Sequence, residues 1–175
     1  MEKKTINSLK PSFMQAINIT ELWCKEWENE LVSDEVFSDR IAELLKTSNG
    51  IRGFFAYALS DINCNLLDKR PFSLIFKLRE EGEKIVDIVV KNLVMSSAQI
   101  ISHKRDKNNN YEDISSNISE RCIDLLRELD TKLVTTKINE VSSNLDNMGN
   151  SFDDSFVYDK EQKDFIREQI SKISN

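Results

Sequence analysis

Apolar and polar positions follow a helical period along most of the chain. The clearest example runs from Glu83 to Arg105, where a polar line crosses the most apolar stretch of the sequence. That line consists of side chains at i, i+4, i+7 and i+11, namely Asn92, Ser96, Gln99 and His103. These intervals place them on one face of an α-helix, while valine, isoleucine and leucine cover the neighbouring faces. We therefore expect a buried central helix near 83–105.

Similar periods predict helices before this segment. One begins at the capping pair Ser12 and Gln15, just after Pro11, and a second begins after Ser33. The run 47–50 is expected to end the second helix, because asparagine and glycine tolerate the left-handed conformation that closes helices. A third period starts at Ile51. The loop expected over 61–70 precedes a short helix after Pro71, for which a strand is the alternative.

After the central helix, the pattern predicts a polar connection over 106–111 and a long helix near 116–147, although the apolar seam of that helix shifts by one position in its middle. Asp159 and Gln162 form a capping pair for a last amphipathic helix. The fold prediction is all-α: a compact multihelical bundle of about six helices. We expect a flexible tail over 1–11 and a single helical domain over 12–175.

Composition supports helices and limits the function classes. The 175 residues include only 4 glycines and 2 prolines, few for a protein rich in tight turns. A net charge of −6 argues against a nucleic-acid partner, which normally requires a basic face. The cysteines are odd in number and widely spaced, which is typical of reduced, packed thiols; they are Cys24, Cys64 and Cys122.

The predicted location is the cytoplasm. The N-terminal residues contain charges but no following apolar run or small-residue cleavage site, so we expect no secretory signal. The apolar run 85–101 is interrupted by charged and amide side chains, which argues against a membrane span.

The polar line has two interpretations. Buried polar side chains usually find hydrogen-bond partners within the protein, so the line is first interpreted as a lock between helices. Alternatively, Asn92, Ser96, Gln99 and His103 orient a small ligand in a pocket along the central helix. Arg52 is added to that candidate ligand site because it lies near a helix start, where anions bind. A crossing oligomer interface is the third alternative.

No catalytic residue, metal site or cofactor is assigned from the sequence. His103 is the only histidine, and a nucleophilic pair with Ser96 or Ser102 would have poor geometry within one helix. A pair between His103 and a cysteine stays open. We find no nucleotide loop and no carboxylate–histidine spacing of a metal site, so a non-enzyme is favoured and an enzyme is kept as the third alternative.

The leading function prediction is non-catalytic association with a protein partner or with a second copy of the chain, in a regulatory, adaptor or self-associating role. Aromatic side chains are enriched in such interfaces. The candidate interface residues are therefore Trp23, Trp27, Phe152, Phe156 and Tyr158. The alternative is a small-ligand-binding or sensor protein.

Overall fold

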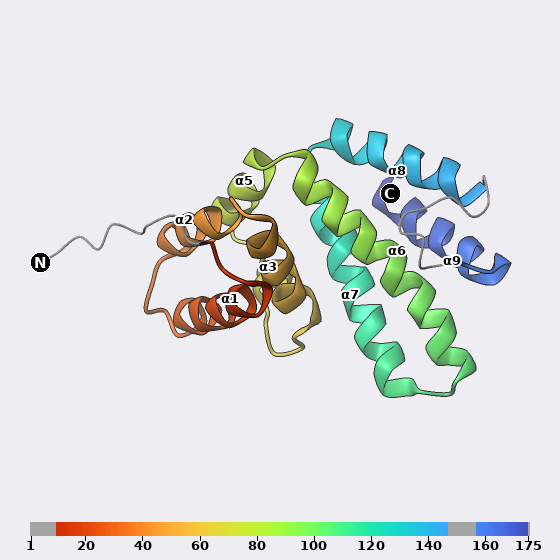
Figure 1. Cartoon of the computed structure of the whole chain (residues 1–175), viewed down its shortest axis with the longest axis horizontal. Coiled ribbons are helices and arrows are strands. Elements are labelled where there is room, and N and C mark those ends of the chain that lie inside the picture. Colours follow the sequence, from red (N-terminus) through yellow and green to blue (C-terminus); the bar gives the residue numbers. More distant parts are fainter. Residues whose placement is uncertain (1–9, 147–156, 175) are drawn as a thin grey trace, which may run out of the picture. The chain divides into compact units, whose positions relative to one another are not determined.

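The computed structural model describes residues 10–146 and 157–174, and every regular element in these two ranges is a helix (Figure 1). The all-α prediction is therefore confirmed. Nine α-helices and one short 3-10 helix form in the described part of the chain, more than the six predicted. They belong to two compact units, Met1–Glu80 and Glu81–Asn175, which are described separately. A single domain over 12–175, with one compact bundle, stays a prediction.

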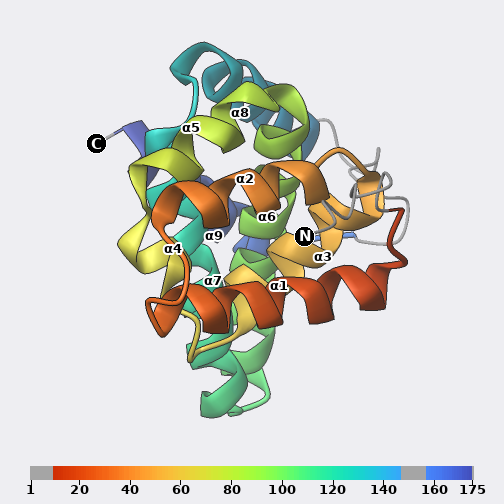
Figure 2. The same ribbon diagram turned by 90° about the vertical axis from the view of Figure 1, so that its left-hand side faces the viewer.

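The first unit contains five helices: α1 (Phe13–Glu28), α2 (Asp34–Leu44), α3 (Ser48–Ser60), α4 (Leu66–Lys69) and α5 (Phe72–Glu80) (Figure 2). α1 packs against α3, and α2 packs against α5. Phe37, Phe54 and Phe55 are fully buried at the centre of this unit. Large apolar side chains removed from water are the main stabilising contribution to such a core. In the expected tail, residues 1–9 lie outside the described ranges, while Pro11 is buried and its carbonyl accepts a hydrogen bond from Asn49.

The predicted helix starts are confirmed. The Gln15 amide donates to Ser12 Oγ (3.2 Å), and the Ser12 amide donates to Gln15 Oε1 (2.8 Å), which completes a capping box. Ser33 Oγ likewise accepts from the Val36 amide (3.3 Å). These contacts satisfy amide groups that the first turn of a helix leaves unpaired. Both starts therefore follow from local side-chain chemistry.

The predicted helix stop over 47–50 is wrong. α2 ends at Leu44, and Thr47 is the N-cap of α3, with its Oγ1 accepting from the Gly50 amide (3.0 Å). Gly50 thus lies in the first turn of α3. A Cβ at Gly50 would lie 1.8 Å from the Leu44 carbonyl oxygen. Only glycine fits at this position, because the chain turns so tightly that a Cβ would collide with the Leu44 carbonyl.

Two further differences concern short segments. The loop expected over 61–70 contains α4, a single turn that begins with the buried Leu66 and Leu67. After Pro71 the chain forms the helix α5, and the strand alternative is wrong. Pro71 has the fixed φ that suits a helix start.

The second unit contains α6 (Glu83–Arg105), α7 (Asn109–Glu128), α8 (Thr131–Asp146), α9 (Lys160–Ser171) and the 3-10 helix η1 (Lys172–Ser174). α6 spans the residues predicted for it and contacts α7, α8 and α9. α6 and α7 form an antiparallel pair (Figure 1). Within the described ranges, α6 is the one helix long and apolar enough to cross a membrane, and 61% of its most apolar window is buried inside the structure.

The long helix predicted near 116–147 is two helices. α7 begins at Asn109, inside the expected polar connection, and ends at Glu128. Leu129 then takes an extended backbone, and Asp130 Oδ1 accepts from the Leu133 amide (2.9 Å), as an N-cap does for α8. The shift in the apolar seam therefore marks a break between helices. Position 147 lies outside the described residues.

Ion pairs tie the other helices to α6. Arg105, at the end of α6, donates to both carboxylate oxygens of Asp159 (2.6 and 3.2 Å) and also pairs with Glu161. Asp159 simultaneously caps α9, since its Oδ1 accepts from the Gln162 amide (3.0 Å), and the predicted capping box is confirmed. Lys137 of α8 pairs with Asp87 of α6 (2.6 Å).

Replacing Gly53 by alanine is expected to lower the stability of the first unit. A Cβ there would lie 2.4 Å from the Cβ of Ala16, so α1 and α3 would have to separate. Overpacking of this kind typically costs about 1–3 kcal/mol. Urea unfolding followed by fluorescence measures the loss, because both tryptophans, Trp23 and Trp27, lie in α1. Ser60→Ala, at the exposed end of α3, is the control. Equal stability of the two variants would contradict the close packing of α1 against α3.

Replacing Asp159 by asparagine is expected to reduce the loss of stability that the protein shows as the pH falls into the acid range. The hydrogen bonds from Arg105 and from the Gln162 backbone lower the pKa of Asp159 from 3.8 to about 2. A carboxylate with a folded pKa below its unfolded value stabilises the fold above 3.8, and this contribution is lost as the pH falls towards 2. Asparagine keeps the N-cap but removes the charge.

Thermal unfolding by circular dichroism across this pH range measures the effect. The melting temperature of the wild type should fall more steeply than that of Asp159→Asn, by a modest margin because both partners are exposed to solvent. Arg105→Gln should flatten the wild-type curve in the same way. Parallel curves for all three proteins would show that the pair does not form in solution.

Candidate functional site

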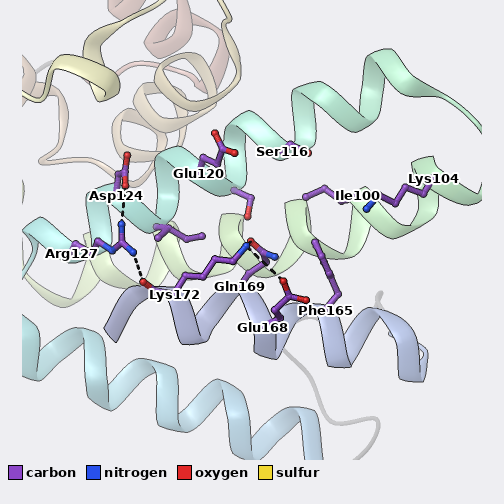
Figure 3. A pocket seen from close by; sticks show the side chains of 12 residues that line it. Ile100, Lys104, Ser116, Glu120, Asp124, Arg127, Phe165, Glu168, Gln169 and Lys172 are labelled. Atoms are coloured by element: carbon purple, nitrogen blue, oxygen red, sulfur yellow. Dashed lines mark hydrogen bonds and ion pairs between the residues drawn. The ribbon is translucent and has the colours of Figure 1, made fainter. Parts of the chain in front are cut away.

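A groove of about 460 Å³ lies in the second unit, where α6, α7 and α9 meet (Figure 3). Apolar side chains from all three helices form part of its wall: Ile100, Ile123 and Phe165. The remaining lining side chains are polar or charged: Lys104, Ser116, Ser119, Glu120, Asp124, Arg127, Glu168, Gln169 and Lys172. The volume and the mixed lining fit a small molecule, since such sites commonly measure about 300–1,000 Å³.

Ser119 is the most informative residue of the groove. Its side chain is on α7 and is only 1% exposed, and its Oγ has no hydrogen-bond partner within the described residues. An unpaired buried hydroxyl costs about 1–3 kcal/mol. A ligand group placed in the groove could remove that cost by donating to Ser119 Oγ or accepting from it.

Gln169 faces the same groove from α9. Its side chain is buried, and its Oε1 accepts a hydrogen bond from Lys172 Nζ (3.0 Å). The amide nitrogen makes no hydrogen bond to another described residue and stays available as a donor. Ser119 and Gln169 therefore supply neutral polar groups from two different helices.

The charged side chains of the groove largely balance one another. Arg127 pairs with Asp124 (3.4 Å) and also donates to the Lys172 carbonyl (2.5 Å), as the dashed lines in Figure 3 show. Lys172 is 3.8 Å from Glu168. Two carboxylates and two cations thus neutralise each other at one end of the groove. This arrangement favours a ligand with little net charge.

At the other end, Lys104 Nζ lies 5.6 Å from the centre of the Phe165 ring and 3.7 Å from Glu112. A cation over a ring face is held by the quadrupole of the ring. Glu120 of α7 makes no ion pair within the described ranges and is exposed. An ammonium or hydroxyl group of a ligand is the natural partner for this carboxylate.

The predicted polar line does not line this groove. Asn92 Nδ2 donates to the Ile88 carbonyl (2.8 Å), and Ser96 Oγ donates to the Leu93 carbonyl (3.2 Å), so both side chains bond within their own helix. The His103 ring is half-buried and stacks on the Tyr111 ring, with the two ring centroids 5.5 Å apart. Gln99 is exposed and lines a smaller cavity of about 130 Å³. A ligand-binding role for these four residues stays a prediction.

The other predicted residues lie elsewhere. Arg52 is exposed on α3, with its guanidinium 5.0 Å from the centre of the Phe13 ring. Trp23 is half-buried in α1. Trp27 is also half-buried and donates from Nε1 to Asp34 (2.6 Å).

Among the remaining predicted interface residues, Tyr158 is half-buried and lines the smaller cavity beside Gln99. Phe152 and Phe156 lie outside the described residues. The interface role of all five aromatic residues therefore stays a prediction. In the ranges that the structure describes, no three histidine, cysteine or acidic side chains are grouped as metal ligands would be.

Sequence reasoning missed the groove, although one signal of it was present. On α7, Ser115 and Ser119 are buried together with Cys122. These three residues follow one another at intervals of 4 and 3, and two successive serines are unusual on a core-facing seam. That pattern could have singled out Ser119. Gln169 had no comparable signal, because its partners come from tertiary packing.

No curated protein and no solved structure matches the chain. One family model does match, over residues 12–173, and its description is "Uncharacterised conserved protein UCP020893". The match covers nearly the whole sequence, and the chain therefore belongs to this family.

Proposed function

We propose that this protein binds a small neutral or zwitterionic molecule in the groove between α7 and α9, as a ligand-binding or sensor protein. The observation that carries this proposal is the buried hydroxyl of Ser119, which has no partner within the described residues. Buried polar groups are normally paired, and the exceptions often reflect a functional role. A bound ligand would supply the missing hydrogen bond.

The composition of the groove supports a small amphipathic ligand. Ile100, Ile123 and Phe165 offer an apolar wall, and Ser119 with Gln169 offers neutral hydrogen-bonding groups. A few convergent polar groups in a partly apolar cavity are typical of small-molecule sites. The balanced charges around them disfavour a ligand of high charge, such as a polyphosphate.

The geometry favours binding over chemistry. Nucleophilic catalysis by a serine requires a base within hydrogen-bond reach of its hydroxyl. Ser119 Oγ has no such neighbour in the described part of the chain, and His103 does not line the groove. The proposed role is therefore non-catalytic, and the proposed location stays cytoplasmic.

A second proposal is self-association through α5. Phe72 and Phe76 lie one turn apart on this helix and are 78% and 50% exposed. Exposed aromatic side chains on one helix face are costly in water and are enriched at protein interfaces. A second copy of the chain presents the same face, as a two-fold symmetric dimer requires.

Replacing Ser119 by alanine is expected to leave the ligand-free protein as stable as the wild type or more stable, by up to about 1 kcal/mol, because an unpaired buried hydroxyl is removed. Ser97→Ala is the matched control. Ser97 is fully buried too, but its Oγ donates to the Leu93 carbonyl (2.6 Å). Loss of this hydrogen bond should leave the free energy of unfolding unchanged or lower it by about 0.5–1.5 kcal/mol. Urea unfolding measures both.

Ligand binding is tested by thermal shift with a panel of free amino acids and neutral polyols. A binder should raise the melting temperature of the wild type and of Ser97→Ala, and the shift should largely disappear in Ser119→Ala. If every binder stabilises Ser119→Ala as much as the wild type, the groove is not the site. If no compound of the panel shifts the wild type, the proposed ligand class is wrong.

Self-association is tested by light scattering over a range of protein concentrations. The wild type should show a mass that rises towards that of a dimer, and the double variant Phe72→Ser, Phe76→Ser should stay monomeric. Met14→Ser and Leu22→Ser, at exposed positions of α1, serve as the control pair. A wild type that is monomeric at every concentration would exclude this proposal.

A further inference from the structure

Three side chains of α7 that can accept hydrogen bonds line the same groove, and we call them the α7 acceptor set: Ser116, Ser119 and Glu120. Intervals of three and four residues from Ser116 place the other two beside it on the helix surface. Ser119 is buried at the floor of the groove, and Glu120 is exposed at its rim. Within the described ranges, none of the three side chains makes a hydrogen bond or an ion pair. Their capacity to accept is therefore unused by the protein.

The charges that line the groove leave one carboxylate unpaired. Each of the three lining cations has a carboxylate partner in the protein, at distances from 3.4 to 3.8 Å. Two of these partners, Asp124 and Glu168, line the groove themselves. Among the described residues, Glu120 is the lining carboxylate that has no cation partner. The α7 side of the groove therefore suits a positively charged group.

A primary ammonium group matches the α7 acceptor set. Such a group carries three N–H donors and one positive charge. Glu120 offers the opposite charge, and the two serine hydroxyls offer neutral acceptors. A hydroxyl group of a polyol has one O–H donor and no charge, so it would use only part of this arrangement. The set therefore favours an amine over a polyol.

The α9 side of the groove offers the opposite polarity. Lys172 Nζ donates to Gln169 Oε1 (3.0 Å), which leaves Gln169 Nε2 as a donor. A carboxylate accepts strongly from N–H groups and is favoured beside a cation such as Lys172. Gln169 and Phe165 lie on α9, whereas Ser116 and Glu120 lie on α7 (Figure 3). A ligand that spans the groove can therefore pair an ammonium group with one helix and a carboxylate with the other.

The apolar part of the groove accommodates a hydrocarbon side chain. Ile100, Ile123 and Phe165 come from three different helices. Removal of an aliphatic group from water against these side chains is favourable. The volume of about 460 Å³ is ample for one small amino acid.

We propose that the groove ligand is an apolar α-amino acid, with its ammonium group on the α7 acceptor set, its carboxylate at Gln169 and its side chain against Phe165. The proposal rests on the ligand-binding function proposed above. It narrows the ligand class from neutral or zwitterionic molecules to one kind of zwitterion.

The test titrates the full-length protein with L-leucine and with two analogues that each lack one charged group. They are 4-methylpentanoic acid, which has no ammonium group, and 3-methylbutylamine, which has no carboxylate. Isothermal titration calorimetry at neutral pH measures the affinities. L-leucine should bind about tenfold more tightly than either analogue, because each analogue leaves charged or polar groups of the groove without a partner. Glycine, which has no apolar side chain, should also bind more weakly than L-leucine.

Variants of α7 locate the ammonium group. Glu120→Gln keeps the size of the side chain and removes its charge, so L-leucine should bind about threefold to fivefold more weakly, while 4-methylpentanoic acid should bind no more weakly than before. Ser119→Ala should weaken L-leucine binding about tenfold, since a hydrogen bond to a charged group is lost. Asp113→Asn, at an exposed acid of α7 outside the groove lining, is the matched control. It should bind L-leucine as the wild type does.

The amino-acid proposal is overturned if 4-methylpentanoic acid binds the wild type as tightly as L-leucine, or if Glu120→Gln keeps the wild-type affinity for L-leucine. It is also overturned if L-leucine does not bind at all. If a neutral polyol then still binds the wild type and not Ser119→Ala, the ligand-binding function stands and only the amino-acid class is wrong. If neither amino acids nor polyols bind, both proposals fail.

Discussion

The second unit depends on one constraint: α6 carries apolar side chains on more of its circumference than one neighbouring helix can cover. α7, α8 and α9 all pack against it, and its buried residues include Ile85, Val90 and Ala98, which lie on different faces. Helices arranged around one axis contact the central helix more closely than they contact each other. The groove is lined by residues of α6, α7 and α9, among them Ile100, so it follows from the way in which α6 is covered.

Buried serines of the second unit differ in their hydrogen bonds according to the helix that carries them. Ser96 and Ser97 are buried in α6, but each hydroxyl donates to the Leu93 carbonyl of its own helix, so no neighbouring helix has to pair with it. Ser119 is buried in α7 without such a bond. The hydroxyl of a serine in a helix can donate to a carbonyl of the preceding turn. Where this hydrogen bond does not form, the hydroxyl stays directed at other groups. Burial alone therefore does not distinguish a structural serine from a candidate binding serine.

Features set by neighbours in the sequence were predictable, and features set by tertiary packing were not. The capping boxes at Ser12 and Asp159 and the span of α6 follow from local side-chain chemistry and from the period of apolar positions. In the sequence, the break at Leu129 appears only as a shift in the apolar seam. Its cause is the N-cap at Asp130, whose Oδ1 accepts from the Leu133 amide. The polar line through Asn92 interrupts an apolar run in the sequence, yet the Asn92 side chain donates to the Ile88 carbonyl of its own helix. The groove combines residues of three helices, and its geometry cannot be read from any one of their periods.

Within the described residues, two buried side-chain oxygens lack a hydrogen-bond partner, and each unit holds one of them. Ser119 Oγ lies in the groove of the second unit, and Asn65 Oδ1 lies next to Cys64 in the first. Each raises the free energy of the folded state, and neither is required by the packing of a helical core, because an alanine or a leucine would fill comparable space without an unpaired oxygen. A fold can retain such costs where a group must meet something that the closed structure does not contain. We propose that at Ser119 this missing partner is a ligand.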